Sequence, residues 1–181
     1  ILDNEGWSVE LVDNRIKHSF EFEQVTEDTF SGITWPKGHV AEGQSIKLRD
    51  YQIECINRFL ANPHGVQEIA TGAGKTLMTA ALSLMCEPYG RTLVIVPNKD
   101  LVKQTQEDYI NLGLDVGVFF GDEKDANHKH VIATWQSINS LIKRYKDGKS
   151  NVSIDILTDD LICVMVDEVH MAKADALKTL L

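Results

Sequence analysis

The stretch Ile69-Ala70-Thr71-Gly72-Ala73-Gly74-Lys75-Thr76 decides the fold. A short apolar run, Val66 to Ile69, leads into it, and a largely apolar pattern of helical type, Leu77 to Cys86, follows it. The two glycines let the backbone turn tightly so that its N–H groups point at an anion, and the next helix presents its positive end to the same place. We therefore expect a strand, a phosphate-binding loop and a helix in this order.

The side chains at the end of this stretch suit a nucleotide. Lys75 can reach the β- and γ-phosphates of ATP, and the Thr76 hydroxyl can bind Mg²⁺. We expect the remaining cofactor contacts from the loop itself, at Thr71, Gly72, Ala73 and Gly74. The alternative is a glycine turn that only begins a helix, because Ile69 stands where the general pattern has a glycine. The Gly-Lys-Thr sequence between a strand and a helix favours the phosphate loop.

Outward from the loop, helical patterns alternate with apolar strands. The expected helices lie at 51–60, 77–86, 100–112 and 136–145, and the expected strands after the loop lie at 92–96, 116–120, 131–133 and 161–166. Strands that are apolar on both faces and alternate with helices predict an α/β fold, with a parallel sheet covered by helices on both faces. Ligands of such folds bind at the carboxyl ends of the strands.

Asp167-Glu168-Val169-His170 follows the last of these strands. A nucleoside triphosphatase needs one carboxylate to hold Mg²⁺ and a second to position the attacking water. An Asp-Glu pair alone is usually a solvated helix start, but together with the loop it favours catalysis. We predict Lys75, Asp167, Glu168 and His170 as catalytic, with Thr76 and Asp167 on Mg²⁺; His170 also has a purely structural alternative.

Length and composition limit what else the chain can contain. The 181 residues suffice for one domain and a small appendage, which we expect at residues 1–45, where short mixed runs suggest strands at 7–12 and 18–22. No apolar run approaches the roughly 20 residues of a membrane span. Three scattered cysteines are typical of reduced core residues in an intracellular protein. The net charge of −9 argues against nucleic acid.

The order of motifs resembles that of superfamily 2 helicases of the DExH branch. The loop and the Asp167–His170 tetrad are similar to their motifs I and II. Leu48-Arg49-Asp50-Tyr51-Gln52 is similar to the Q-type motif, which implies that Gln52 reads adenine and that Arg49 or Tyr51 borders it. The segments 96–104 and 133–137 are similar to motifs Ia and Ic, and Phe120-Gly121 stands where a double glycine is common. The nucleic-acid contacts that the resemblance implies are Asn98, Lys99, Gly121, Thr134 and Gln136.

Within that group, the segments 96–104 and 133–137 most resemble the phage UvsW-type helicases and the XPB-like repair helicases, over about residues 46 to 175. The resemblance implies a RecA-like first lobe at 46–181, which uses ATP and Mg²⁺ and works on DNA, with RNA left open. Residues 1–45 would be the remnant of a substrate-recognition domain. The chain starts at Ile1 and ends inside a predicted helix, so we expect a fragment whose second lobe, with its arginine finger, is missing. Such a fragment should bind ATP without efficient turnover.

The expected function is an ATP-dependent helicase or translocase that remodels branched DNA in recombination and repair, in the cytoplasm, or the host-cell cytoplasm for a phage protein. One alternative is a double-strand translocase of the restriction-motor or remodeller type. Another is a P-loop ATPase that acts as a switch on a protein partner. Related motors grip nucleic acid through main-chain amides, hydroxyls and helix N-termini, so an acidic lobe is compatible with DNA.

Three smaller features keep two interpretations each. His128 and His130 suggest a metal site or, more simply, a polar loop. Trp135 suits base stacking or core packing. The basic run 143–146 suits DNA contact or a solvated helix end.

Overall fold

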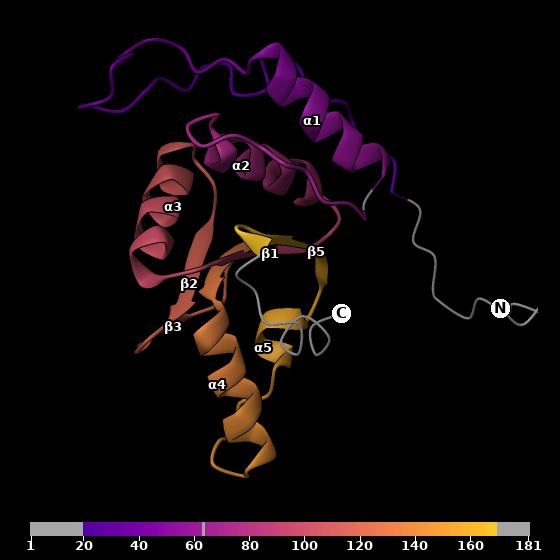
Figure 1. Cartoon of the computed structure of the whole chain (residues 1–181), viewed down its shortest axis with the longest axis vertical. Coiled ribbons are helices and arrows are strands. Elements are labelled where there is room, and N and C mark those ends of the chain that lie inside the picture. Colours follow the sequence, from indigo (N-terminus) through magenta and orange to yellow (C-terminus); the bar gives the residue numbers. More distant parts are fainter. Residues whose placement is uncertain (1–19, 63, 170–181) are drawn as a thin grey trace, which may run out of the picture.

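The computed structural model describes residues 20–62 and 64–169 (Figure 1). The helices are α1 (Asp50–Ala61), α2 (Lys75–Cys86), α3 (Lys99–Asn111), α4 (Trp135–Lys146) and α5 (Asp155–Thr158). The strands are β1 (Arg91–Val96), β2 (Val116–Phe120), β3 (Glu123–Asp125), β4 (His130–Thr134) and β5 (Leu161–Val166). Each helix and strand predicted between residues 92 and 166 is present, with bounds that match or shift by one residue, and the helix expected at the end of the chain lies outside the described residues.

The sheet has the order β3-β2-β4-β1-β5. Strands β2, β4, β1 and β5 run parallel, and only the short edge strand β3 is antiparallel to its neighbour. In the register of the central strand, Val94 of β1 lies between Ile132 of β4 and Met165 of β5. The predicted α/β fold with a parallel sheet is confirmed. The carboxyl ends of the four parallel strands therefore meet at one edge of the molecule.

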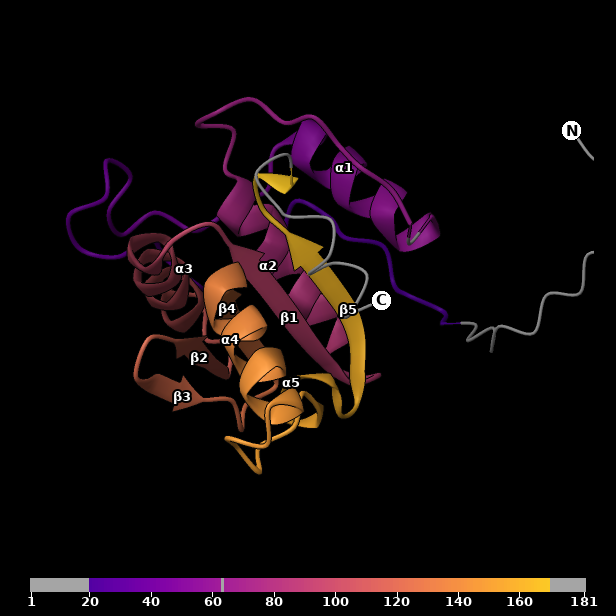
Figure 2. The ribbon, with the colours of Figure 1, turned by 60° about the horizontal axis from the view of Figure 1, so that its bottom comes forward.

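Helices cover both faces of this sheet, because successive strand side chains point to opposite sides. Leu93 packs in one cluster with Ile138 of α4 and Leu157 of α5. Its neighbour Val94 packs in the other cluster with Met78 of α2, to which α1 and α3 also contribute. Figure 2 shows α4 and α5 on one side of the sheet and α2 and α3 on the other. Strands β1, β2 and β4 are largely apolar on both faces, and both of their faces are buried.

The described part of the N-terminal region packs on the same core. Val25, Phe30, Ile46 and Leu48 are buried in the cluster that contains α1 and α2. Asn57 of α1 fastens this region by donating to the Val25 carbonyl (3.1 Å) and accepting from the Val25 N–H (2.8 Å). The region 20–49 holds no strand beyond an isolated bridge between 34 and 45. The strand expected at 18–22 is thus wrong for residues 20–22, and the one expected at 7–12 lies outside the described residues.

The strand expected at 66–69 is also wrong. This segment has no regular structure, and Val66 is 80% exposed. In the structure it forms no ladder with β5, the last strand on that side, which pairs only with β1 among the described residues. Sequence analysis missed β3 and α5 for a different reason. The first consists of three exposed charged residues and the second of four residues, so neither carries a periodic apolar signal.

Two expectations from composition can be checked against the structure. Cys55, Cys86 and Cys163 are all free thiols. Every helix in the described part of the chain is too short or too polar to cross a bilayer.

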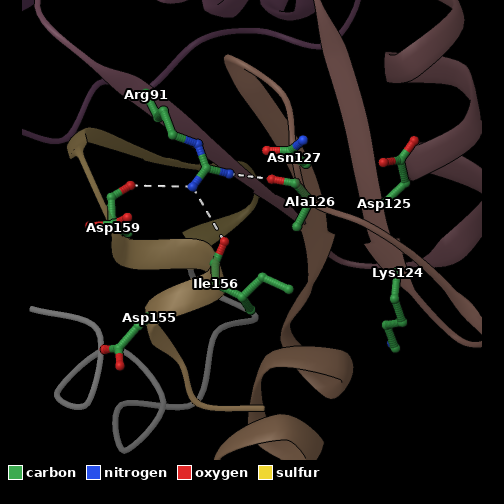
Figure 3. Close-up of a pocket in the computed structure, with 8 residues that line it drawn as sticks. All are labelled: Arg91, Lys124, Asp125, Ala126, Asn127, Asp155, Ile156 and Asp159. Carbon is green, nitrogen blue, oxygen red and sulfur yellow. Dashed lines mark hydrogen bonds between the residues drawn. The ribbon is translucent and has the colours of Figure 1, made fainter.

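Arg91 is the first residue of β1, at the opposite end of this strand from the phosphate loop, and its side chain joins two connecting segments there (Figure 3). Its guanidinium donates to the carbonyls of Ile156 (3.3 Å), within α5, and of Asp159 (3.2 Å), directly after it. It also donates to the carbonyls of Ala126 and His128, in the connection between β3 and β4. One side chain thus joins two segments that have no strand pairing with each other.

We predict that Arg91→Ala lowers the free energy of unfolding by about 2–3 kcal/mol, because four carbonyls, two of them in part-buried hydrogen bonds, lose a charged donor. Arg91→Lys should recover only part of this, since an ammonium cannot reach carbonyls on both sides. Arg58→Ala is the matched control. It removes an exposed pair with Glu54 on the surface of α1 and should cost less than about 1 kcal/mol. Urea unfolding measures all three variants. Equal losses of unfolding free energy in Arg91→Ala and Arg58→Ala would contradict the role of Arg91 in joining these two segments.

Candidate nucleotide and nucleic-acid site

The phosphate loop turns sharply into α2 at its two glycines. Gly72 and Gly74 both have φ of +80°, a conformation that side-chain-bearing residues rarely adopt. A Cβ on Gly74 would also lie 2.6 Å from the Gln52 Nε2 atom, so the Gln52 side chain would have to shift. Gly74 is the N-cap of α2, and no side chain caps that terminus. The amides at the start of α2 are therefore available to an anion, as the sequence predicts.

The predicted catalytic residues of the loop and of the tetrad lie together. The Lys75 Nζ atom is 3.0 Å from Glu168 Oε1 and 4.0 Å from Asp167 Oδ1. The Asp167 N–H donates to the Ile95 carbonyl (2.9 Å), which extends the β1–β5 ladder by one residue. Glu168 follows in the left-handed region with φ of +52°. Thr76 is the next residue of α2, and His170 lies outside the described residues.

The donor set at this point suits a magnesium nucleotide. Mg²⁺ takes oxygen ligands, usually one or two carboxylates together with phosphate oxygens and water. Asp167 and Glu168 supply half-exposed carboxylates, and Thr76 supplies a hydroxyl one residue from Lys75. Lys75 offsets part of the carboxylate charge here. The cluster can therefore hold a phosphate chain on Lys75, with the two carboxylates reaching the phosphates through Mg²⁺.

The residues of the Q-type motif reach the same loop from the start of α1. The buried Gln52 donates through Nε2 to the Ala73 carbonyl (2.9 Å) and accepts at Oε1 from the Arg49 N–H (2.9 Å). The Tyr51 hydroxyl also donates to the Ala73 carbonyl (2.8 Å), and an Arg49 guanidinium nitrogen lies 3.4 Å from that hydroxyl. In this structure both ends of the Gln52 amide are engaged with backbone, while Arg49 and Tyr51 are exposed beside it.

The five residues predicted to contact nucleic acid line one groove of about 860 Å³. They are Asn98, Lys99, Gly121, Thr134 and Gln136, and they follow the carboxyl ends of β1, β2 and β4. The groove lies beside two helix N-termini. Asn98 caps α3 by accepting from two backbone amides (3.0 Å each), and Thr134 caps α4 by accepting from the Ser137 N–H (3.4 Å). Both termini favour an anionic ligand.

Sequence analysis missed other residues of this groove. Lys124 of β3 lines it and had no signal, because β3 itself was not predicted. Ser137, Ser140 and Arg144 line it from a single face of α4. Arg144 belonged to the basic run whose role the sequence left open. The helical spacing of these three positions was the available signal for that face.

The structure decides two of the open alternatives. His130 is fully buried against the Thr92 hydroxyl (2.9 Å), whereas His128 lies in a separate exposed cluster with Asp115 (2.6 Å), whose hydrogen bond raises the pKa of His128. His130 is the first residue of β4, so the polar-loop interpretation fits His128 alone, in the connection between β3 and β4. Trp135 is buried in the core cluster with Ile138, which favours packing over base stacking.

Comparisons with known proteins agree with this geometry. The family model "Type III restriction enzyme, res subunit" matches residues 45–181. The DNA 3'-5' translocase XPB2 of Sulfurisphaera tokodaii is 40% identical over 80 residues, which is 43% of this chain and 18% of that protein. The ATP-dependent DNA helicase uvsW of Enterobacteria phage T4 is 27% identical over 142 residues, which is 72% of this chain and 26% of that protein. The chain thus spans about a quarter or less of these relatives.

The fold itself is also found in a solved structure. The crystal structure of the UvsW helicase from bacteriophage T4 superposes with a TM-score of 0.67 at 22% identity, over 98% of this chain and 61% of that one. The family match covers well over half of the chain and includes the phosphate loop, the groove residues and the Asp167–Glu168 pair. The chain therefore belongs to the family of the type III restriction enzyme res subunit, a helicase-domain family of superfamily 2.

Proposed function

We propose that this chain is the ATP-binding first lobe of a DNA helicase or translocase that remodels branched DNA in recombination and repair. One observation carries the proposal. The Lys75–Asp167–Glu168 cluster and the groove of the five predicted nucleic-acid contacts are both built at the carboxyl edge of the same parallel sheet. Because the two sites share one edge of the sheet, nucleotide binding can change the groove, and nucleic acid in the groove can change the nucleotide site.

At the nucleotide end, each residue has a definite task. Lys75 and the amides of residues 71–76 bind the β- and γ-phosphates, and Thr76 and Asp167 hold Mg²⁺. The bound metal would neutralise charge that develops on the phosphates. Glu168 orients the attacking water and accepts its proton. His170, directly after this pair, would couple the nucleotide to the groove.

We further propose that residues 46–181 form one of two RecA-like lobes and that residues 1–45 trail from a substrate-recognition domain. An arginine from the second lobe would complete the charge stabilisation at the γ-phosphate. This chain alone should then bind ATP without efficient turnover. We place the protein in the cytoplasm, and in the host-cell cytoplasm for a phage protein.

The family model supports a second candidate, a double-strand translocase of the restriction-motor type. The two candidates differ in the nucleic acid that drives ATP hydrolysis. A switch that acts on a protein partner is less consistent with the groove, because a switch has no use for three basic side chains facing one cavity without an acidic one.

The deciding experiment is the ATPase rate of the full chain, joined to its second lobe, with no nucleic acid, with single strands, with plain duplex and with forked DNA. Branch remodelling predicts the largest stimulation with forked DNA. A response to plain duplex equal to that with forks would favour the restriction-motor type. A rate unchanged by every nucleic acid would contradict the proposal.

A second prediction concerns Gln52, which we propose reads adenine once a nucleotide displaces its contact with Ala73. Gln52→Ala should reduce the preference for ATP over GTP by about tenfold, the equivalent of one hydrogen bond. Asn57→Ala is the matched control, because it removes an amide from the same helix that also makes two backbone hydrogen bonds, to Val25. Competition binding measures both variants. Equal weakening of ATP and GTP in Gln52→Ala would mean that this residue only supports the loop.

A further inference from the structure

The groove contrasts in charge with the rest of the chain. The sequence holds 27 acidic and 18 basic residues, yet none of the residues that line the groove is acidic and three of them, Lys99, Lys124 and Arg144, are basic. Within residues 20–62 and 64–169, no carboxylate lies within ion-pair distance of these three. The cations of the groove are therefore available to an anion from solution.

Two of the three come from outside the helicase-like motifs. Lys124 lies on the edge strand β3, with its Nζ atom 4.2 Å from the centre of the Phe119 ring, which orients it over the floor of the groove. Figure 3 shows its side chain pointing away from Arg91. Arg144 lies in the last turn of α4. Burial lowers the pKa of Lys124, and although the Asp122 carboxylate opposes this, the nearby Arg144 charge adds to it.

One face of α4 connects these cations to the motif residues. Thr134 and Gln136 mark the N-terminal end of the helix, and Ser137, Ser140 and Arg144 continue along the groove. At 1.5 Å per residue, the ten helical steps from Thr134 to Arg144 span about 15 Å. At 3.4 Å per nucleotide along one strand, this length corresponds to roughly four nucleotides. Hydroxyls followed by two cations are groups that bind phosphates without reading bases.

The groove has a definite end. Lys124 and Ile156 also line the smaller pocket around Arg91, which is about 410 Å³ in volume. That pocket is lined by Asp125, Asp155 and Asp159, whose negative charge repels phosphate. An anionic strand that enters at the motif residues is thus attracted as far as Lys124 and Arg144 and no further.

We propose that Lys124 and Arg144 bind the sugar–phosphate backbone of a DNA strand that continues from the motif residues along α4. This inference rests on the proposed function and adds two sequence-independent phosphate contacts to it. The two residues set affinity and its dependence on salt, while the motif residues remain at the nucleotide-proximal end of the groove.

The test is the salt dependence of DNA binding by the full chain, followed by fluorescence anisotropy with two labelled single strands of unrelated sequence. Lys124→Gln/Arg144→Gln should lower the slope of log K against log salt by about 1.4, because each lost phosphate contact contributes about 0.7 for single strands. Both strands should weaken by the same factor, roughly tenfold or more at low salt.

Lys143→Gln/Lys146→Gln is the control, because it also removes two positive charges, both from the turn of α4 that holds Arg144, at residues that do not line the groove. It should leave the slope within the error of the unaltered protein, and thermal unfolding checks that both variants are folded. An unchanged slope in the groove variant, or an equal loss in the control, overturns this inference alone. Absence of DNA binding by the unaltered protein overturns the proposed function as well.

Discussion

The ion pair between Lys75 and Glu168 joins two parts of the chain that are 93 residues apart in sequence. Its side chains are about one third exposed, so it should contribute no more than about 1 kcal/mol to stability. Its importance is positional. It requires the start of α2 and the end of β5 to lie at the same edge of the sheet. A half-exposed cation beside two carboxylates can also exchange its partner for a phosphate at little cost.

Both proposed sites depend on that edge. The parallel register of β1, β4 and β5 brings their carboxyl ends level, so that the residues following each strand become neighbours. The turn after β5 faces the phosphate loop, while the turns after β1, β2 and β4 line the groove. Helices α3 and α4 begin there with their N-termini toward the groove. A parallel sheet thus supplies positive helix ends and polar turns on one side without any excess of basic residues, which explains how an acidic chain can still receive an anionic strand.

Much of this was predictable from sequence because it depends on local patterns. The glycines at 72 and 74 need a conformation that few other residues adopt, and the run 161–166 is apolar on both faces, so loop and strand were both recognisable. The five groove residues were found through motif resemblance, and their convergence follows from the parallel order of the strands.

Other features depend on tertiary context that the sequence does not display. The segment 66–69 is apolar like a strand, but in the structure it pairs with none of the described strands. Lys124 faces the groove only because three polar residues add an antiparallel edge strand to β2. Arg91 binds carbonyls from two connections whose proximity no local pattern encodes. For Arg91 the deciding contacts join segments that are 37 and 65 residues apart in sequence.

The most direct measurement is a crystal structure of the chain with Mg²⁺ and a non-hydrolysable ATP analogue. If Lys75, Asp167 and Glu168 form one nucleotide site, the Lys75 Nζ atom should leave Glu168 and contact the β- and γ-phosphates, with Mg²⁺ between the phosphates, Thr76 and Asp167. A nucleotide bound elsewhere, or a Lys75–Glu168 pair still at about 3.0 Å with the analogue in place, would contradict this assignment.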